Sequence, residues 1–207
     1  MQTGYFTTEM NSRSPSGKLI LASRSPYRRA LLKRLGIPFT VHVSDIDELS
    51  LPGEATGHLT RRLALAKAHA VAGVIPGAFV VGSDQLAEIA GISIGKPGSE
   101  EKAFAQLMNF SGRSVTFHTS AAVICQAAGY CQSKTIETVV RFRKLTEEEV
   151  RRYIALDQPL DCAGAFRSEA GGPMLLRSQR SSDPTAIIGL PLIAVAGMLR
   201  KAGFKLP

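Results

Sequence analysis

The stretch Leu19-Ile20-Leu21-Ala22-Ser23-Arg24-Ser25-Pro26-Tyr27-Arg28-Arg29 decides how the chain begins to fold. Its first four residues are apolar and predict a short buried strand. Ser25 followed by Pro26 is typical of a helix N-cap with proline at the first helical position. The stretch therefore predicts a strand, a tight turn and the start of a helix. A helix start exposes backbone N–H groups and the positive end of the helix dipole, so this junction favours a bound anion.

The predicted helix lies in a strongly basic part of the chain. From residue 18 to residue 34 every charged side chain is positive: Lys18, Arg24, Arg28, Arg29, Lys33 and Arg34. Together with the helix start, this charge indicates a cradle for phosphate groups. A surface helix whose basic side chains form a solvated face would carry the same pattern, and the helix alone does not separate the two interpretations.

The composition is that of an ordinary globular protein with a surplus of positive charge. Of 207 residues, 44% are hydrophobic and 20% are charged, which allows a substantial core in one domain or in two lobes around a cleft. The formal net charge of +8 favours a polyanionic partner, meaning a nucleotide, a nucleic acid or a membrane surface, without choosing among them.

The cysteines and the lack of long apolar runs bear on the compartment. Cys125, Cys131 and Cys162 are odd in number and lack the paired spacing of a zinc site, so we expect reduced thiols in a cytoplasmic protein. No apolar run has the length needed to cross a bilayer. We expect the polar residues 1–17 to form a flexible extension.

An acidic block, Asp45, Asp47 and Glu48, follows a strand predicted near residues 39–43. Carboxylates close to a phosphate site are candidate ligands for Mg2+, which prefers oxygen ligands and bridges to substrate phosphates. An acidic loop that balances nearby arginines would have the same composition. The block alone leaves both interpretations open.

The next segment, residues 56–72, has apolar residues at helical spacing and predicts a helix. Lys67 falls at the border of its buried face. A lysine at such a border usually extends its ammonium group into water. Lys67 therefore matters here only if it points into the same cleft as the other basic groups.

A carboxylate lies at the end of a second predicted buried strand. The run Ala78-Phe79-Val80-Val81-Gly82-Ser83-Asp84 predicts a buried strand that breaks at Gly82 and delivers Asp84 at its carboxyl end. Open α/β sheets bind ligands at that end of their strands. A carboxylate there can act as a general base toward water or hold a metal ion, whereas an aspartate that only caps a loop does neither.

The remaining elements are expected mainly to shape the fold. They are a hairpin over residues 86–94, a helix capped by Ser99 and ending near residue 110, strands over residues 115–125 and 130–142, a helix from the capping box of Thr146 and Glu149 to about residue 156, and a closing helix over residues 191–202. Lys96 lies in a Gly-Lys-Pro turn, and Glu169 lies among glycines that allow backbone to approach a ligand closely. Neither the Gly-rich Lys-Ser/Thr phosphate loop nor the dinucleotide fingerprint is present.

Eight blocks of the sequence resemble, in order and spacing, the Maf-like nucleotide pyrophosphatases: LILASRSPYRRALLKRLG, VSDIDE, RLALAKA, VVGSDQ, GKP, LMNFSG, CAGAFRSEA and IIGLPL. The resemblance covers residues 18–204 and is strongest with the 7-methyl-GTP branch. It implies an α/β (mixed α+β) fold in which a twisted mixed β-sheet is flanked by helices, with two lobes around a deep cleft, as one domain over residues 18–207. It also implies cleavage of nucleoside triphosphates between the α- and β-phosphates, with a divalent metal cofactor, Mg2+ or Mn2+.

The resemblance also implies roles for individual residues, carried over by position. Asp84 matches the catalytic carboxylate, the proton acceptor that activates water. The residues that match the phosphate contacts are Ser23, Arg28, Lys67 and Lys96. Glu48 is implied as the metal-side partner of Asp84. The positions that distinguish the branches of the family in their choice of base are Tyr27, Gln85 and Glu169.

The chemistry of a methylated guanine agrees with these last three assignments. A guanine methylated at N7 is positively charged, so the ring of Tyr27 would gain a cation–π interaction of about 0.5 to 2 kcal/mol. The base edge offers N–H donors, which the carboxylate of Glu169 accepts better than a neutral amide does, and Gln85 would add a polar contact to base or sugar. The branch more often has Trp at the position of Tyr27, Lys at Arg167 and Gly at Ser181. Because tyrosine is the smaller platform, the preference for the methylated base is less firmly implied than the reaction type.

Two other functions stay open from the sequence. One is a pyrophosphatase of the same kind that acts on dTTP, UTP or another modified nucleotide. The other is a basic RNA-binding or regulatory module without hydrolysis, which predicts an RNA affinity that depends strongly on salt. With a small nucleoside triphosphate as substrate, neither a nucleic acid nor a membrane is required as a partner, and a homodimer is left open.

Overall fold

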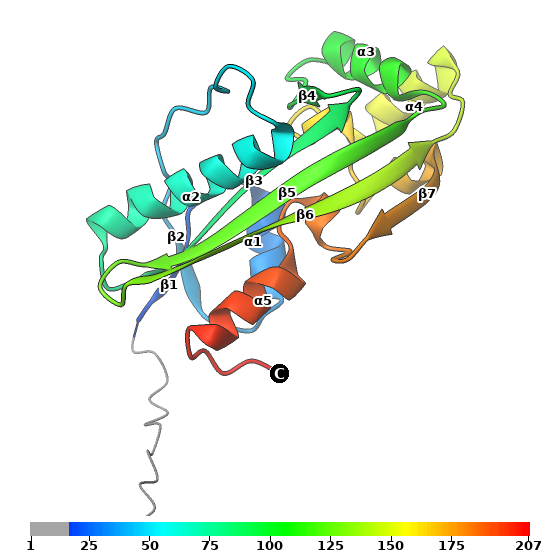
Figure 1. The fold of residues 1–207 in the computed structure, drawn as a ribbon. Coiled ribbons are helices and arrows are strands. Elements are labelled where there is room, and N and C mark those ends of the chain that lie inside the picture. The colour runs from blue at the N-terminus through cyan, green and yellow to red at the C-terminus, as the bar shows by residue number, and fades with distance from the viewer. Residues whose placement is uncertain (1–16) are drawn as a thin grey trace, which may run out of the picture.

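The computed structural model describes residues 17–207, in which one mixed sheet carries helices on its faces (Figure 1). The strands are β1 (Leu19–Leu21), β2 (Phe39–Val41), β3 (Phe79–Ile89), β4 (Ile92–Ile94), β5 (Ser114–Cys125), β6 (Tyr130–Phe142) and β7 (Leu176–Ser181). The helices are α1 (Pro26–Lys33), α2 (Thr56–Val74), α3 (Glu100–Phe110), α4 (Glu147–Asp157) and α5 (Leu192–Lys201), with short 3-10 turns η1 (Ala163–Ala165), η2 (Gly172–Leu175) and η3 (Ala186–Ile188). No helix in residues 17–207 is both long enough and apolar enough to span a membrane. Apart from Gly17, the extension predicted at residues 1–17 lies outside the described residues.

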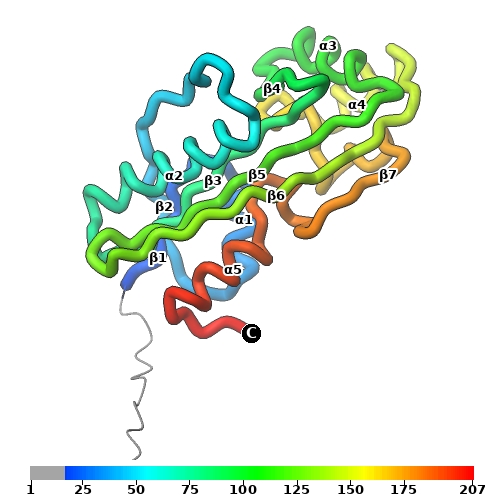
Figure 2. Tube along the Cα trace, in the orientation of Figure 1, coloured from blue at the N-terminus to red at the C-terminus, as the bar shows by residue number. Residues whose placement is uncertain are grey.

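The sheet combines parallel and antiparallel pairs in the order β2-β1-β3-β5-β6-β7, and β4 pairs with β3. β1 is parallel to both β2 and β3. From β3 onward each neighbour is antiparallel. The long strands β3, β5 and β6 connect the two ends of the molecule (Figure 2). A mixed sheet flanked by helices is the predicted fold class, which is confirmed.

Helices cover both faces of the sheet in the half of the molecule that holds β1 and β2 (Figure 1). Leu19 of β1 belongs to a buried cluster with Leu32 of α1 and Leu199 of α5. Its neighbour Ile20 belongs to a different buried cluster, with Ala68 of α2. Successive side chains of a strand point to opposite faces. β1 is therefore apolar at every position because it is buried on both sides.

A third buried cluster fills the other half of the molecule, between α3, α4 and the far ends of the long strands. Aromatic rings make up much of it. The ring centroids of Phe110 and Phe142 lie 5.3 Å apart, and those of Phe117 and Phe166 lie 5.7 Å apart. Each half of the molecule thus has its own buried core.

Most predicted elements are present, with small shifts at their ends. Ser25 caps α1 as expected, because its Oγ accepts a hydrogen bond from the backbone N of Arg28 at 3.3 Å. α1 runs from Pro26 to Lys33. The hairpin of β3 and β4, the Ser99 cap of α3, the two long strands and the capping box of α4 are confirmed.

β7 was not predicted from the sequence. Its residues, Leu-Arg-Ser-Gln-Arg-Ser, lack the alternation of apolar and polar side chains that indicates a half-buried strand. It pairs with β6 on one side only and forms the edge of the sheet. Its side chains are mostly exposed, so the strand is held by backbone pairing and not by an apolar face.

The predicted break at Gly82 is wrong. β3 continues through Gly82 to Ile89, and Gly82 pairs with Ala122 of β5 in regular register. A Cβ atom at Gly82 would lie 2.8 Å from the backbone N of Ala68, so the glycine is required because α2 packs directly on the strand. Asp84 consequently lies in the middle of β3 and not at its carboxyl end.

One edge of β3 is left open where Asp84 lies. On that edge β1 pairs with β3 as far as Val81, and β4 pairs with it from Ala87 onward. Among the described strands none pairs with residues 82–86 on this side. The chain thus leaves a gap between two strand partners of β3, and this gap positions the site.

Candidate active site

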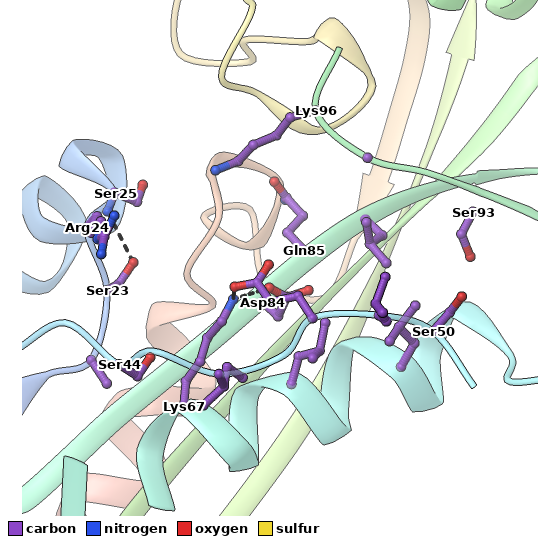
Figure 3. Close-up of a pocket in the computed structure, with 18 of the residues that line it drawn as sticks. Ser23, Arg24, Ser25, Ser44, Ser50, Lys67, Asp84, Gln85, Ser93 and Lys96 are labelled. Carbon is purple, nitrogen blue, oxygen red and sulfur yellow. Dashed lines mark hydrogen bonds and ion pairs between the residues drawn. The ribbon is translucent and has the colours of Figure 1, made fainter. Parts of the chain in front are cut away.

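A cavity of about 830 Å3 opens at the gap in the edge of β3 (Figure 3). Five segments contribute to it: the turn from β1 into α1, the loop at residues 43–54, α2, the middle of β3 and the loop after β4. The predicted catalytic, phosphate and metal residues all line this cavity: Ser23, Arg28, Glu48, Lys67, Asp84 and Lys96. The fold therefore brings together side chains that lie up to 73 positions apart. In Figure 3, Lys67 reaches in from α2 and Lys96 from the loop after β4.

The centre of the cavity is a lysine held between two carboxylates. Lys67 Nζ lies 2.6 Å from Asp84 Oδ1 and 2.8 Å from Glu48 Oε1. Lys67 and Asp84 are only 8% and 6% exposed. A lysine at the border of a buried face usually extends its ammonium group into water, and for Lys67 this expectation is wrong. The side chain stays buried because two carboxylates compensate its charge.

Asp84 presents its second oxygen to the cavity. Oδ1 accepts the hydrogen bond from Lys67, and within residues 17–207 no side chain or backbone group donates to Oδ2. The strand fixes the carboxylate, because residues on both sides of Asp84 are paired with β5. A carboxylate held this way, with one oxygen open to the cavity, can accept a proton from a water molecule or bind a cation.

The loop that carries Glu48 is fastened to α2 by Arg62. Its Nε and Nη2 each lie 2.7 Å from an oxygen of Glu54, and Nη2 also donates to the carbonyl of Leu49 at 2.9 Å. A bidentate contact of this kind fixes the orientation of both side chains. Of the other two members of the acidic block, Asp45 also lines the cavity. Asp47 does not line it and accepts a hydrogen bond from the backbone N of Leu49.

Arg28 is fixed by backbone carbonyls at the floor of the cavity. Its Nε donates to the carbonyl of Gly189 at 2.9 Å, and its Nη1 donates to the carbonyl of Ser83 at 2.8 Å and to Ser23 Oγ at 3.4 Å. Burial lowers the pKa of the Arg28 guanidinium, and the carboxylates of Asp84 and Glu48 oppose that effect. Arginine keeps its charge in proteins, so a positioned cation faces the cavity here.

Gln85 is held so that only its oxygen is left to meet a ligand. Its Nε2 is within hydrogen-bonding distance of Thr119 Oγ1 at 2.9 Å and of the carbonyls of Ala186 and Ile187 at 3.0 Å each. Because both carbonyl oxygens can only accept a hydrogen bond, the side-chain atom that faces them must be the amide nitrogen of Gln85. The sequence predicted a polar contact by Gln85, and the structure defines it as an acceptor.

A second, much smaller pocket of about 60 Å3 adjoins the first and shares Arg28, Gln85 and Lys96 with it. All three residues predicted to distinguish bases line it, since Tyr27 and Glu169 join Gln85 there. The predicted phosphate contacts and the predicted base contacts thus lie side by side in adjoining parts of one cleft.

Polar neighbours hold Tyr27 in the small pocket. Tyr27 Oη donates to Asp161 Oδ1 at 3.1 Å. Burial, Cys162 and Asp161 raise the pKa of the Tyr27 phenol above its ordinary value, so the ring stays neutral at physiological pH. Burial also raises the pKa of the Cys162 thiol to about 12, which leaves it protonated and a poor nucleophile.

The sequence did not indicate the role of Arg167. Its Cζ lies 5.4 Å from the centre of the Tyr27 ring, and its Nε lies 3.5 Å from Glu169 Oε1. The backbone between residues 186 and 189 was also missed, although its carbonyls fix Arg28 and Gln85. These residues lie in and beside the IIGLPL block, in which Gly189 has a φ of +125° that is unfavourable for other residues.

The carboxylates of Glu48 and Asp84 suit a divalent cation whose remaining ligands would come from the substrate and water. Both have an oxygen within 2.8 Å of the same ammonium group. In residues 17–207 no group of three or more His, Cys, Asp or Glu side chains is arranged to hold a metal. Mg2+ is commonly bound through one or two carboxylates together with substrate phosphates and water. The donor set therefore suits such an ion and does not form a closed metal cage.

The fold and the cleft define a class of protein: a mixed α/β protein in which a carboxylate, two fixed cations and a further lysine line a cavity that suits a small polyanion. Comparison with known sequences gives the family. The sequence profile of the Maf-like proteins matches residues 18–202, and the chain belongs to this family. The resemblance found in the sequence is confirmed.

Sequences of known proteins align with nearly the whole length of this chain. A protein from Polaromonas is 47% identical over 201 residues, which are 97% of this chain and 92% of the relative. One from Bordetella pertussis is 50% identical over 186 residues, covering 90% and 92%. One from Pseudomonas aeruginosa is 46% identical over 189 residues, covering 91% and 98%. Each of these relatives is named 7-methyl-GTP pyrophosphatase.

Proposed function

We propose that this protein hydrolyses 7-methyl-GTP to 7-methyl-GMP and diphosphate. The observation that carries the proposal is the cleft itself, in which the carboxylate of Asp84 and the cations Arg28, Lys67 and Lys96 line one cavity. The names of relatives that are 46 to 50% identical along nearly the whole chain support the choice of substrate. Removal of modified nucleotides from the cellular pool would be the use of such a reaction.

Asp84 acts as the general base in this proposal. Its open oxygen accepts a proton from a water molecule, which attacks the α-phosphorus in line with the departing diphosphate. A correctly placed base contributes about 10²- to 10⁴-fold to a rate. The central position of Asp84 on a fully paired strand suits this role, because little reorganisation is needed before the reaction.

The cations and the helix start hold the triphosphate. Arg28, Lys67 and Lys96 meet the negative charge that develops on the leaving oxygens, and positioned cations account for much of the catalysis of phosphoryl transfer. Ser23 Oγ accepts hydrogen bonds from the backbone N of Ser25 and from Arg28 Nη1, so its own O–H can donate to a phosphate beside the start of α1. Arg28 is especially suited to this task, because two backbone carbonyls already fix its guanidinium.

Glu48 and Asp84 would hold the divalent ion, Mg2+ or Mn2+, that the family resemblance implies. When bound, the ion supplies charge neutralisation and orientation of the phosphates. Lys67 would then give up part of its contact with the two carboxylates and turn toward a phosphate. The ion would then take the place that Lys67 Nζ holds between the two carboxylates, 2.8 Å from Glu48 Oε1 and 2.6 Å from Asp84 Oδ1.

The small pocket would read the base. Gln85 and Glu169 both present acceptors, and the edge of a guanine offers donors at N1 and at its exocyclic amine. Tyr27 presents an aromatic ring, which favours a positively charged base. A uracil or thymine edge offers one donor between two acceptors, so two protein acceptors suit it less well.

A nucleotide panel tests the proposal directly. The purified protein is assayed for diphosphate release from 7-methyl-GTP, GTP, dTTP, UTP and ATP, with and without added Mg2+ or Mn2+. We expect the highest kcat/KM with 7-methyl-GTP and dependence on the metal. A higher value for dTTP or UTP would move the protein to that alternative, and release of single phosphates would refute the assignment of the bond. Salt-dependent RNA binding with no hydrolysis of any nucleotide would support the RNA-binding alternative.

A further inference from the structure

We propose that the buried hydroxyl group of Ser83 positions the guanidinium of Arg28 for the phosphates of the substrate. The inference deepens the proposed function and rests on it. Ser83 precedes Asp84 in β3, is fully buried and lines neither part of the cleft. It is therefore a positioning residue, which acts on the substrate only through Arg28 and the carbonyl of Gly189.

Ser83 controls both carbonyl groups that hold Arg28. Its own carbonyl accepts a hydrogen bond from Arg28 Nη1 at 2.8 Å. Its Oγ donates to the carbonyl of Gly189 at 2.9 Å, and the same carbonyl accepts a hydrogen bond from Arg28 Nε, also at 2.9 Å. Ser83 thus supplies the first carbonyl and holds the second. Arg28, Ser83 and Gly189 together form a closed hydrogen-bond ring.

The carbonyl of Gly189 depends on this support. Gly189 follows the short turn η3, and its backbone lies directly against Arg28, because a Cβ atom at Gly189 would lie 3.6 Å from Arg28 Nε. Among residues 17–207, the hydroxyl group of Ser83 is the one donor to the Gly189 carbonyl besides Arg28 itself. Without that hydroxyl group, the carbonyl would be held by Arg28 alone and would fix the guanidinium less firmly.

The hydroxyl group of Ser83 also ties the hydrogen-bond ring to the sheet. Ser83 Oγ lies 2.8 Å from the carbonyl of Ser120 on β5, so its single proton is shared between the carbonyls of Ser120 and Gly189. Ser83 itself pairs with Ala121 of β5 in regular register. The ring is therefore anchored to two paired strands in the centre of the sheet.

The hydrogen-bond ring also sets Arg28 in register with the proposed base. The carbonyl that accepts from Arg28 Nη1 belongs to the peptide unit that joins Ser83 to Asp84. Successive side chains of a strand point to opposite faces. Asp84 accordingly meets Lys67 on one face, whereas Ser83 meets Gly189 on the other. A shift of Arg28 against this peptide unit is also a shift against Asp84, and small misplacements of catalytic groups lower the rate.

The hydrogen-bond ring leaves one side of the guanidinium for the substrate. Arginine has five N–H donors in a planar group. The three on Nε and Nη1 have acceptors in the carbonyls of Gly189 and Ser83 and in Ser23 Oγ. No group within residues 17–207 accepts a hydrogen bond from Nη2. The two N–H groups of Nη2 are therefore available to a phosphate, and the bonds on the opposite edge fix their direction.

Kinetics of Ser83→Ala test the proposal. Diphosphate release is measured with 7-methyl-GTP and GTP, and kcat and KM are determined separately. We expect kcat/KM to fall by about three- to tenfold because Arg28 is held less firmly, and to fall equally for both nucleotides because they share the triphosphate. Ser83→Cys keeps a weaker donor of similar shape and should lie between Ser83→Ala and the wild type.

Ser111 provides the matched control. Its Oγ donates to the carbonyl of Leu145 at 3.3 Å, and it lines neither part of the cleft. Ser111→Ala should leave kcat/KM unchanged. Equal losses in Ser111→Ala and Ser83→Ala would attribute the effect to a general loss of stability and would overturn the proposal.

A double-mutant cycle separates positioning from a merely structural role. Arg28→Lys keeps the charge but lacks the planar group that the two carbonyls hold. If Ser83 acts through Arg28, adding Ser83→Ala to Arg28→Lys should lower kcat/KM by less than about twofold more. If the losses of the two single variants multiply in the double variant, Ser83 acts independently of Arg28 and the proposal is wrong.

A measurement without substrate separates this inference from the proposed function. The Nε–H signal of Arg28 in a proton–nitrogen NMR spectrum is assigned by its loss in Arg28→Lys. Its exchange with solvent should be at least about threefold faster in Ser83→Ala than in the wild type, because the bond to Gly189 opens more often. Unchanged exchange would refute the role of Ser83, whatever the protein hydrolyses. Faster exchange in a protein that releases no diphosphate would support the positioning of Arg28 and refute the proposed function.

Discussion

The two parts of the cleft differ in how far they are prepared for a ligand. In the phosphate part, a cavity of about 830 Å3 is surrounded by side chains that the fold already fixes, such as Arg28 on two carbonyls and Lys67 between two carboxylates. In the base part, the pocket beside Tyr27 and Glu169 has a volume of about 60 Å3. Arg167 is not among its lining residues, although its Cζ lies 5.4 Å from the centre of the Tyr27 ring and its Nε lies 3.5 Å from Glu169 Oε1.

The difference indicates that the two parts do different work. A prepared site lowers the cost of ordering charged groups when the substrate binds, which suits the step that all nucleoside triphosphates share. A small pocket whose walls are held by hydrogen bonds can reject ligands whose shape and hydrogen-bonding groups do not match it. Variants in the phosphate part should therefore change the rate for every nucleotide, and variants in the base part should change the ratio between nucleotides.

Asp84→Asn should have the largest effect. The amide removes the proposed base but keeps the size of the side chain, so kcat should fall by about 10²- to 10⁴-fold for every nucleotide tested. Diphosphate release measures the rate, and a thermal melt shows whether the fold is kept. Glu147→Gln, the same change on the exposed face of α4, is the control. Near-wild-type turnover in Asp84→Asn would remove Asp84 from the role of base.

Lys67→Met should have the next largest effect, and this effect should again be the same for every nucleotide. The substitution leaves Asp84 and Glu48 without their shared cation, and loss of one partner of a buried ion pair costs about 3 to 5 kcal/mol. Urea unfolding should show lower stability, and kcat should fall for all nucleotides by about the same factor. Lys102→Met on the exposed surface of α3 is the control. A change confined to one nucleotide would contradict the division between the two parts.

Glu169→Gln should lower the preference for 7-methyl-GTP over other nucleotides, with only a weak effect on the rate of 7-methyl-GTP cleavage. The amide keeps an acceptor oxygen but loses the charge that favours a cationic base, so the preference for 7-methyl-GTP over UTP or dTTP should fall by about tenfold. The measurement is kcat/KM for each nucleotide. An unchanged ratio would mean that the base is read by other residues.

Tyr27→Phe should have the smallest effect. It removes the hydrogen bond to Asp161 but keeps the ring, so the substrate ratio should change by less than about threefold, whereas Tyr27→Leu should lower it by about three- to tenfold. Because burial raises the pKa of Tyr27, the phenol stays protonated as the pH rises through the physiological range, and the ratio should not follow its ionisation between pH 6 and 9. A larger loss in Tyr27→Phe than in Tyr27→Leu would show that the hydroxyl group, and not the ring, reads the base.

Several features of this protein follow from local sequence. The apolar run before Ser25 and the cap at Ser25 with Pro26 determine β1 and the start of α1, because both depend on neighbouring residues. The capping box of α4 and the hairpin of β3 and β4 have the same origin. The ordered blocks around Asp84 and Glu169 indicated the family, and with it the candidate site.

The tertiary structure decided the features that depend on residues distant in sequence. Gly82 indicates a strand break when only its neighbours are considered, and its real reason is the approach of α2, which packs against it. Lys67 is buried because Glu48 and Asp84 reach it from 19 and 17 positions away, and a helical pattern carries no information on such partners. Arg167 meets Tyr27 only because the chain returns to that residue 140 positions later. Short-range rules determine how segments fold, whereas charge compensation and close packing between segments determine which side chains meet.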